Sequence, residues 1–291
     1  MSGLSKYLQS PEILSNAAAI GSAGLRDTLL DKGAEWYKNH PDESALIRSN
    51  LAAFGLRCDD ETVASVEHHI ALHYYEKLLP LCGNPQWYRN FISENVEISD
   101  ATAQILEAVQ TGGALVAAAH FGAVELVPPS LSTTKIPVNP VLRFTTEKFS
   151  QMARERASAM ESSGLFGHIN FIEIGREGTM AALDMAAAIR RKEILLSVFD
   201  EETGYSTPAK LFGRTVQGGA GLQNLIKFAR APMSVFCAFM VRLPQGKYRF
   251  DLVPIPQSDD TVSAMYAALE RKLSDNLEQW YFLHEEIPFV N

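Results

Sequence analysis

A run of six apolar residues, from Ala114 to Ala119, limits the possible folds more than any other part of the sequence. A strand that faces water on one side alternates apolar and polar residues, whereas an unbroken apolar run indicates a strand that is buried on both faces. Such strands are typical of parallel sheets, whose two faces are both covered by helices. The sequence therefore predicts a mainly parallel sheet around this strand.

The rest of the C-terminal two thirds of the chain contains further short apolar segments that alternate with helical patterns. We expect further strands at 136–144, 169–174, 194–199, 233–241 and 248–255. We expect helices at 147–162, 178–191, 218–230 and 259–281, of which 218–230 begins with several glycines. A turn at 244–246 predicts that the last two strands are antiparallel neighbours. This alternation indicates an α/β fold with a mostly parallel central sheet flanked by helices.

The N-terminal third has helical periodicity instead. Apolar residues at helical spacing predict helices over residues 11–83, with Asp59 or Asp60 as the cap of the third, and another amphipathic helix covers 100–110. We therefore expect an N-terminal helical cap region at 1–110 and an α/β core at 111–291. A chain of 291 residues can bury both around one core, so we expect one compact domain.

Cysteine and histidine usage argues against a metal centre. The three cysteines, Cys58, Cys82 and Cys237, have no paired spacing, which favours buried thiols in a reducing compartment. His69 and His73 have the i, i+4 spacing of metal ligands, but the glutamate of a zinc protease motif is missing between them. We expect no metal site and no cofactor.

Two further features of the composition bear on location and partners. The sequence shows no secretory pattern and no apolar stretch long enough for an integral membrane segment, so we expect a soluble, cytoplasmic protein. The net charge is −8, yet residues 143–249 carry 15 Lys and Arg against 10 Asp and Glu. This basic middle could meet an anionic group on a substrate or carrier, although solvated helices show a similar imbalance.

His120 and Glu125 bracket the point where the first strand ends. On one helix a five-residue separation would place them roughly 140° apart, so they cannot share a helical face. A strand, a turn at Gly122 and a following helix would instead place Glu125 close enough to hold one imidazole nitrogen of His120. A histidine at a strand end can also be purely structural, and His-x4-Glu occurs by chance.

Polar residues follow several of the predicted strands. In open α/β sheets the reacting groups gather beyond the carboxyl ends of the strands. His120, Arg143, Asp200 and Arg242 each lie at or near one of these ends. Backbone N–H groups at the start of a helix can stabilise an oxyanion, and the candidates here belong to Phe121, Gly122 and Ala123.

Several short motifs occur in an order that suggests a family. They are Ile47 to Leu51, His120 to Glu125, Val141 to Arg143, Phe199 with Asp200, Leu211 to Arg214, and Gln279 to His284. With these motifs the chain resembles the bacterial lipid A biosynthesis acyltransferases over residues 44–287. They are a branch of the lysophospholipid acyltransferase superfamily, whose signature is His-x4-Asp/Glu.

The resemblance implies roles for individual residues. His120 would be the general base, with Glu125 as its carboxylate partner. Substrate contacts would come from an active-site arginine, an aspartate after a later strand, and a loop: Arg143, Asp200, and Phe212, Gly213 and Arg214. The residues by themselves also allow a surface charge for Arg214 and a structural cap or salt bridge for Asp200.

The function implied is transfer of an acyl group to a hydroxyl or amine acceptor. The donor would be an acyl carrier protein or coenzyme A thioester, and an aminoacyl-tRNA ester would suit the same base chemistry. We expect no counterpart of the family's hydrophobic N-terminal anchor, and Glu285 and Glu286 follow the segment from Trp280 to His284, where the family has basic residues. These differences favour a small or carrier-bound acceptor, as in specialised metabolism.

Two other classes of protein fit the same residues. In a hydrolase or thioesterase with the same dyad, water would replace the acceptor. In a non-catalytic acyl-binding or carrier-binding module, His120 would not be needed for activity. A serine or cysteine hydrolase is disfavoured because no Gly-x-Ser-x-Gly nucleophile elbow is present.

Overall fold

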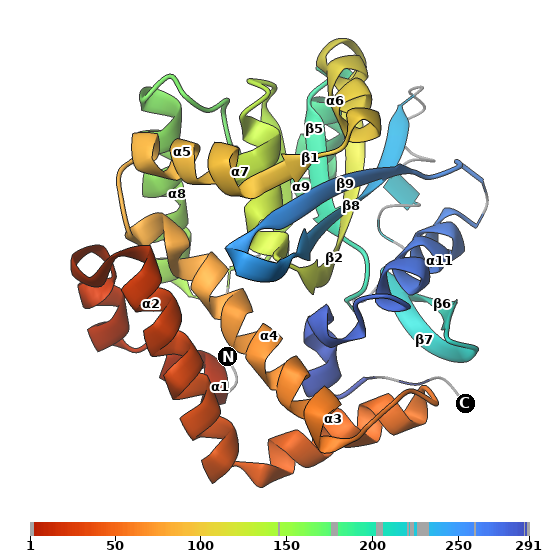
Figure 1. The fold of residues 1–291 in the computed structure, drawn as a ribbon. Coiled ribbons are helices and arrows are strands. Elements are labelled where there is room, and N and C mark those ends of the chain that lie inside the picture. The colour runs from red at the N-terminus through yellow and green to blue at the C-terminus, as the bar shows by residue number, and fades with distance from the viewer. Residues whose placement is uncertain are drawn as a thin grey trace.

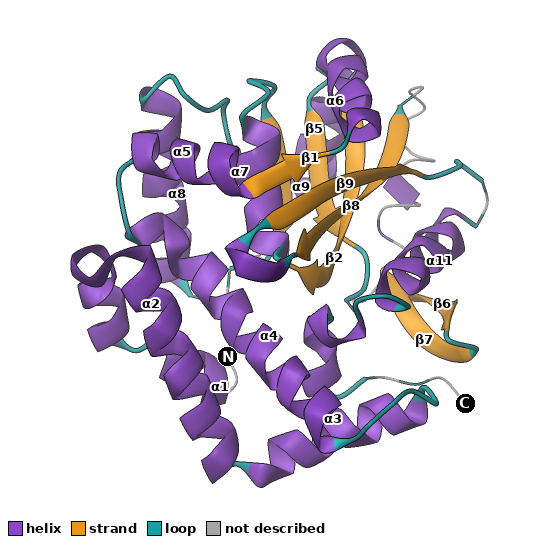
Figure 2. Ribbon diagram, viewed as in Figure 1, coloured by secondary structure: helices purple, strands orange, loops and turns teal. Residues whose placement is uncertain are grey.

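The computed structural model describes residues 3–144, 146–175, 180–201, 206–219, 221, 224–225, 233–258, 260–287 and 289. Within this part of the chain, N-terminal helices precede a seven-stranded sheet that is flanked by further helices (Figures 1 and 2). The predicted α/β class, with a mostly parallel sheet and an N-terminal helical region, is confirmed.

The main sheet has the strand order β1-β9-β8-β2-β5-β3-β4. Its strands are β1 (Val96–Ile98), β2 (Ala114–Gly122), β3 (Val138–Leu142), β4 (Ile172–Glu173), β5 (Ile194–Val198), β8 (Ser234–Arg242) and β9 (Tyr248–Pro254). All neighbouring pairs are parallel except β8 with β9, which are antiparallel as predicted. The sequence order of the strands therefore differs from their order in space, and β5 comes to lie next to β2.

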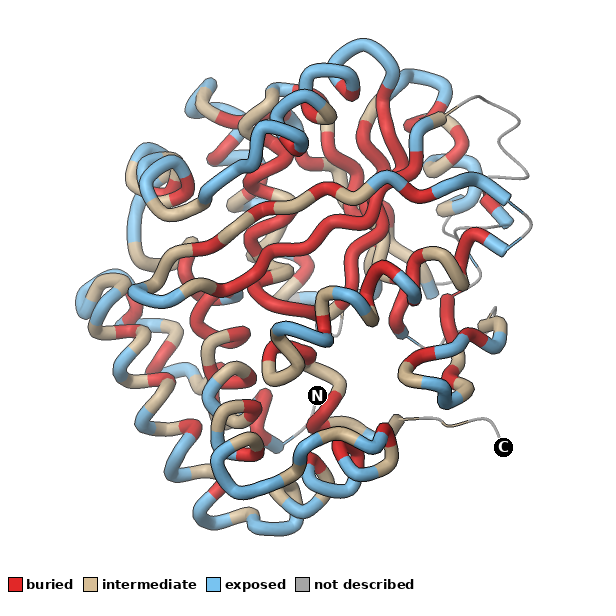
Figure 3. The backbone as a smooth tube through the Cα atoms, turned by 45° about the vertical axis from the view of Figure 1, so that its right-hand side comes forward, coloured by how far each residue is buried: buried red, intermediate tan, exposed pale blue. Residues whose placement is uncertain are grey.

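Strand β2 is the centre of the sheet. It pairs with β8 on one side and β5 on the other, and residues Ala114–Ala119 are at most 2% exposed. The buried backbone of the sheet forms the middle of the molecule in Figure 3. The unbroken apolar run thus corresponds to a strand covered on both faces, which is what its composition predicted.

Helices of the core flank this sheet. They are α6 (Asp100–Gly112), α7 (Val127–Ser132), α8 (Glu147–Ser162), α9 (Ala181–Arg190) and α11 (Thr261–Leu273). The bounds of α8 agree with prediction because Thr146 is a clear N-cap, whose hydroxyl accepts the Phe149 N–H. Most of the helix expected at 218–230 lies outside the described residues, and Gly218 and Gly219 belong to a strand.

The prediction of one long helix at 259–281 is wrong. Helix α11 ends at Leu273, and two short 3₁₀ helices follow, η4 (Leu277–Gln279) and η5 (Tyr281–His284). Between α11 and η4 lie Ser274, Asp275 and Asn276, which favour helix ends because their side chains compete for backbone hydrogen bonds. The break lets Trp280 adopt an extended conformation and bridge to Phe121.

A second, two-stranded sheet was not predicted. Strands β6 (Ser206–Leu211) and β7 (Arg214–Gly219) form an antiparallel hairpin whose turn uses positive φ angles at Phe212 (47°) and Gly213 (74°). The Tyr266 hydroxyl of α11 donates to the Gln217 carbonyl at 3.2 Å. The Gly219 N–H donates to the Phe199 carbonyl at 2.8 Å. These two hydrogen bonds hold the hairpin against α11 and beside the carboxyl end of β5.

The N-terminal region comprises α1 (Gly3–Leu8), α2 (Pro11–Asn39), α3 (Pro41–Ala53), α4 (Asp60–Leu78) and α5 (Pro85–Asn95). Asp59 caps α4, as predicted, by accepting the Thr62 N–H at 2.9 Å. In Figure 1, α4 lies near the carboxyl end of β2. Strand β1 also comes from this region, yet it pairs with β9 at the edge of the main sheet. None of the helices that the structure describes is both long and apolar enough to cross a membrane.

Candidate active site

His120 is the last residue but two of strand β2, at the carboxyl edge of the sheet. Its side chain is 22% exposed, so the imidazole is mostly enclosed but still reachable. The ring of Phe282 meets it edge to face, with ring centroids 4.8 Å apart, and the ring of Tyr281 lies at 6.2 Å. The aromatic residues of η5 therefore form one wall around the imidazole.

Asp200 forms two hydrogen bonds with His120 and a third with Trp280. Its Oδ1 lies 2.9 Å from His120 Nδ1, and its Oδ2 accepts the His120 backbone N–H at 2.8 Å and the Trp280 indole N–H at 3.1 Å. The Asp200 side chain is fully buried. An ionised carboxylate can only accept hydrogen bonds, so the ring nitrogen that faces it must carry a proton. In neutral His120 the proton is therefore on Nδ1, and Nε2 carries the free lone pair.

The pairing of β2 with β5 explains this contact across 80 residues of sequence. Ala118 is in register with Val198, and the Phe199 N–H donates to the Ala118 carbonyl at 3.1 Å. Both strands therefore end at the same edge, with His120 and Asp200 as their first polar side chains beyond the buried ladder. Parallel neighbours bring their carboxyl ends together in this way in every open α/β sheet.

Two opposing effects act on the pKa of His120. Burial lowers it because the imidazolium loses water, while the charge of Asp200 and its hydrogen bond raise it, with smaller contributions from Glu201 and Glu125. The net effect is a pKa above the ordinary value of 6.5. His120 is thus a stronger base than a free histidine, and Asp200 is the main reason.

Glu125 does not hold His120 as the His-x4-Glu spacing suggested. It lies in the single 3₁₀ turn η2 (Val124–Leu126), before α7 begins, and its Oε1 is 3.7 Å from Nε2 of His73 on α4. In the part of the chain that the structure describes, no hydrogen bond joins it to His120. The reason is the backbone: β2 continues past His120 to Gly122, and the turn directs Glu125 toward α4.

The turn after His120 also uses backbone groups that were predicted to bind an oxyanion. Gly122 has a φ of 59°, and a Cβ there would come within 2.0 Å of the Met240 carbonyl oxygen. The Ala123 N–H donates to that same oxygen at 2.8 Å. Phe121 forms a β-bridge with Trp280. The Ala123 N–H is therefore already used, and this turn is first of all a junction between β2, β8 and the C-terminal segment.

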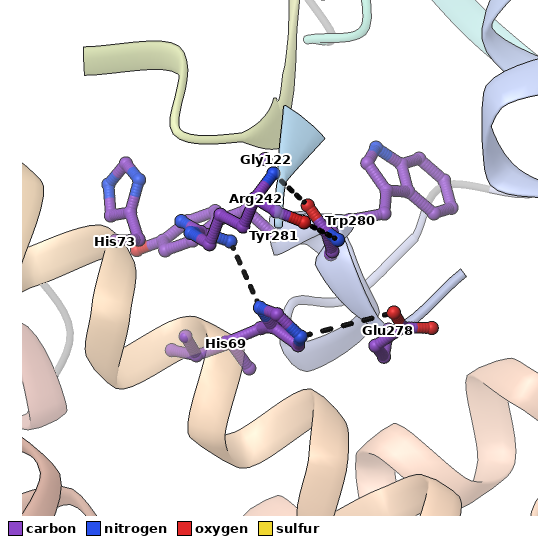
Figure 4. A pocket seen from close by; sticks show the side chains of 9 residues that line it. His69, His73, Gly122, Arg242, Glu278, Trp280 and Tyr281 are labelled. Carbon is purple, nitrogen blue, oxygen red and sulfur yellow. Dashed lines mark hydrogen bonds and ion pairs between the residues drawn. The ribbon is translucent and has the colours of Figure 1, made fainter. Parts of the chain in front are cut away.

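Arg242, at the carboxyl end of β8, is part of a buried ion pair. Its guanidinium donates from Nε and Nη2 to the two carboxylate oxygens of Glu76, each at 2.7 Å, and both side chains are buried. Figure 4 shows the narrow pocket beside it, where Nη1 lies 3.5 Å from Nδ1 of His69. This bidentate ion pair connects α4 to the sheet, and it leaves Arg242 no freedom to reach a substrate.

His69 and His73 line this pocket as neutral side chains. Burial, followed by the charge of Arg242, lowers the pKa of His69 to about 3. Burial also lowers the pKa of His73 well below its ordinary value. His69 Nε2 is 3.9 Å from the Glu278 carboxylate. The described residues contain no group of three or more His, Cys, Asp or Glu side chains that could hold a metal ion.

The remaining predicted residues lie farther from the imidazole. Arg143 directly follows β3, which is separated from β2 by β5, and its exposed side chain packs over Gly175. Phe212, Gly213 and Arg214 form the tip of the β6–β7 hairpin. The Phe212 ring lies 6.0 Å from that of Phe54, and Phe54 lies 5.8 Å from Trp280. The hairpin tip thus packs on Phe54, which in turn packs on Trp280 beside the site.

A cavity of about 220 Å³ lies beside Asp200, and His120 is not among the described residues that line it. Strand β7, not the hairpin tip, contributes to it through Val216 and Gln217. The other described residues that line it are Asp200, Glu201, Tyr266, Trp280, Phe282, Glu285, Glu286 and Ile287. The charged side chains among them are all carboxylates. The lining is therefore apolar and aromatic on one part and acidic on another.

From the sequence, Asp200 was named but not its contact with His120, and Trp280 was named only as part of the motif from Gln279 to His284. The contact between Asp200 and His120 depends on the strand order, because β2 and β5 are separated in sequence by η2, α7, β3, α8, β4 and α9. The usable signal in the sequence was that His120 and Asp200 each lie at or just beyond the end of a buried apolar run. No protein-family model matches the chain, and no curated protein matches it.

Proposed function

We propose that this protein is an acyltransferase that moves an acyl group from an activated donor to a hydroxyl or amine acceptor. The observation that carries the proposal is the contact between His120 Nδ1 and the buried Asp200 carboxylate, at 2.9 Å, at the carboxyl edge of a parallel sheet. The resemblance to the lipid A biosynthesis acyltransferases supports the reaction type, because that family uses a histidine base at this place in the sequence.

The reaction follows from the protonation state of His120. Nε2 of the neutral imidazole takes the proton of the acceptor hydroxyl or amine as that group attacks the acyl carbonyl. A new C–O or C–N bond forms, and the tetrahedral intermediate then breaks the bond to the thiol or alcohol of the donor. The imidazolium returns its proton to this leaving group. A positioned base of this kind contributes about 10²- to 10⁴-fold to the rate.

In this scheme Asp200 has the role that the resemblance gives to Glu125. It fixes the Nδ1–H tautomer and stabilises the imidazolium that forms during the reaction. Glu125 acts on His120 only through its charge, which raises the pKa of the imidazole less than Asp200 does. The His-x4-Glu motif would thus supply the base, and the carboxylate that orients it would come from the segment just after β5.

The lining of the cavity favours some substrates over others. Its described charged residues, Asp200, Glu201, Glu285 and Glu286, would repel an anionic acceptor. A neutral alcohol or a cationic amine suits this environment better, and the aromatic side chains Trp280 and Phe282 can pack against its apolar part. Arg143, exposed at the same sheet edge, is available for a phosphate of the donor.

The test is product analysis with the purified protein and three kinds of donor: acyl carrier protein thioesters, coenzyme A thioesters and aminoacyl-tRNA. Each donor is offered with a panel of alcohols and amines, and products are identified by mass. We expect an acylated acceptor that is lost in His120→Ala and retained in His168→Ala, which removes an exposed histidine bonded to Glu161.

Two results would contradict the proposal. Release of free acid without acylated acceptor, dependent on His120, would identify a hydrolase. Equal turnover by the wild type and His120→Ala would remove His120 from the mechanism.

A further inference from the structure

Four consecutive residues of the C-terminal segment, Gln279 to Phe282, each contact a different part of the site. The Gln279 amide both accepts the Arg242 N–H at 2.8 Å and donates to the Arg242 carbonyl at 3.0 Å. Trp280 donates to Asp200, Tyr281 bonds to the Tyr74 hydroxyl at 2.9 Å, and Phe282 packs on His120. The segment thus joins the ends of β8, β5 and β2 to helix α4.

Trp280 has the most specific of these contacts. Its indole N–H and the His120 backbone N–H both donate to Asp200 Oδ2, at 3.1 and 2.8 Å. With two donors on Oδ2, the carboxylate cannot rotate freely, and Oδ1 is left to face His120 Nδ1. Trp280 is itself buried and held by the backbone bridge to Phe121, so its N–H has a fixed direction.

From these contacts we propose that Trp280 is a positioning residue for the reaction of His120. It holds the Asp200 carboxylate in the orientation that keeps the proton of the neutral imidazole on Nδ1 and leaves Nε2 free to act as the base. This role in catalysis rests on the proposed function, whereas the orientation itself is a property of the protein without substrate. The two can therefore be tested separately.

The alternative is that Trp280 only fills the core. The two roles differ in what they predict for the imidazole. A core residue contributes to stability through its ring, and loss of the N–H alone would leave His120 unchanged. A positioning residue controls the tautomer, because free imidazole prefers its proton on Nε2 and only an oriented acceptor at Nδ1 reverses that preference.

The test uses Trp280→Phe, which keeps an aromatic ring and removes the N–H. Phe54→Leu is the matched control, because Phe54 packs on the same indole with ring centroids 5.8 Å apart and does not touch Asp200. Nitrogen-15 NMR of labelled histidine reports the tautomer, and His120→Gln assigns the signal. The other titratable groups near His120, which are Glu125, Glu201, Glu285 and His73, are the same in both variants.

We expect neutral His120 to be almost wholly in the Nδ1–H form in the wild type and in Phe54→Leu. In Trp280→Phe a substantial share of the Nε2–H form should appear. If an acylated product has been found, the turnover number of Trp280→Phe should fall roughly 10- to 100-fold with little change in KM, as for loss of a hydrogen bond to a charged group. An unchanged tautomer in Trp280→Phe, or an equal change in Phe54→Leu, would overturn the proposal.

A second measurement needs no substitution of Trp280 and covers the case in which Trp280→Phe fails to fold. In the wild-type protein, the indole N–H resonance of Trp280 should shift with pH at the same midpoint as His120, because both groups share the Asp200 carboxylate. An indole resonance that stays constant while His120 titrates would contradict the contact. Neither NMR result depends on finding an acyl donor, so failure of the acyltransferase proposal would remain distinguishable.

Discussion

Two histidine–carboxylate pairs lie near each other in this protein, and they differ in almost every property. His120 meets Asp200 at 2.9 Å, its side chain is 22% exposed, and its pKa is raised. His73 lies 3.7 Å from Glu125, its side chain is 8% exposed, and its pKa is lowered well below the ordinary value. Among the described residues, its Nδ1 has no hydrogen-bond partner. The first pair suits a base, whereas the second keeps a neutral imidazole.

The carboxylates account for the contrast. Asp200 is fully buried and accepts three hydrogen bonds, so its negative charge is fixed in direction and poorly screened by water. Glu125 is 34% exposed and lies beyond hydrogen-bond distance of His73. At His73, burial and then the charges of nearby cationic groups such as Lys77 and Arg242 lower the pKa. At His120, burial also lowers the pKa, but the charge of Asp200, its hydrogen bond and the smaller contributions of Glu201 and Glu125 together outweigh it. The comparison teaches that the environment of the carboxylate, more than its spacing in the sequence, decides which histidine becomes basic.

The largest effect is expected for Asp200→Asn. An amide can still hold the ring, but it removes the charge that stabilises the imidazolium and no longer requires the proton on Nδ1. Acyl transfer should fall by about 10²- to 10⁴-fold, close to the loss in His120→Ala. The measurement is the turnover number with saturating donor, beside circular dichroism to confirm folding. A loss of less than about threefold would mean that Asp200 does not assist the base.

The second prediction concerns the dependence of the rate on pH. The base must be neutral, so below the raised pKa of His120 the rate should fall about tenfold for each pH unit. In Asp200→Asn, burial is left without its main opposing effect, and the midpoint should move to lower pH. Rates measured between pH 5 and 9 in the two proteins check this order. A midpoint that moves to higher pH in Asp200→Asn would contradict it.

The third prediction addresses the other pair through folding stability. In the folded protein His73 stays neutral, but in the unfolded chain it takes up a proton below its ordinary pKa of 6.5. Its lowered pKa thus contributes stability that is present above pH 6.5 and is lost as the pH falls. Relative to His73→Asn, the wild type should lose about 1.4 kcal/mol of unfolding free energy per pH unit below 6.5. Urea titrations at pH 7.5, 6 and 5 measure the unfolding free energies of both proteins. If the two free energies change with pH by the same amount, His73 is not buried as described.

The smallest effect is expected for Glu125→Gln. Because Glu125 acts on His120 only through its charge, the variant should lose less than about fivefold in rate, with a slightly lower pKa of His120. The same assay with Asp200→Asn provides the comparison. If Glu125→Gln is as damaged as Asp200→Asn, then the role implied by the His-x4-Glu resemblance belongs to Glu125 after all.

Much of the fold could be predicted because its signals are local. The apolar run of β2 and the Thr146 cap of α8 each depend on residues that are adjacent in sequence. The antiparallel pairing of β8 with β9 depends on one short turn between them. The β6–β7 hairpin was missed because Pro208 and the two glycines at its end are not typical of strands.

The site was only half predicted, for a physical reason. The sequence shows that His120 and Asp200 lie at the ends of buried apolar runs, but their contact depends on β5 inserting next to β2. The position of Trp280 depends on the break after α11, where Ser274 to Asn276 end the helix before the residues that meet the sheet. Such contacts are set by tertiary packing, which local spacing does not encode.

The most direct test of the central claim is the pKa of His120, measured by NMR in the wild type, Asp200→Asn and Glu125→Gln without any substrate. We predict a value above 6.5 in the wild type, a fall below 6.5 in Asp200→Asn, and only a small decrease in Glu125→Gln. A large decrease in Glu125→Gln together with little change in Asp200→Asn would contradict the assignment of Asp200 as the partner of the base.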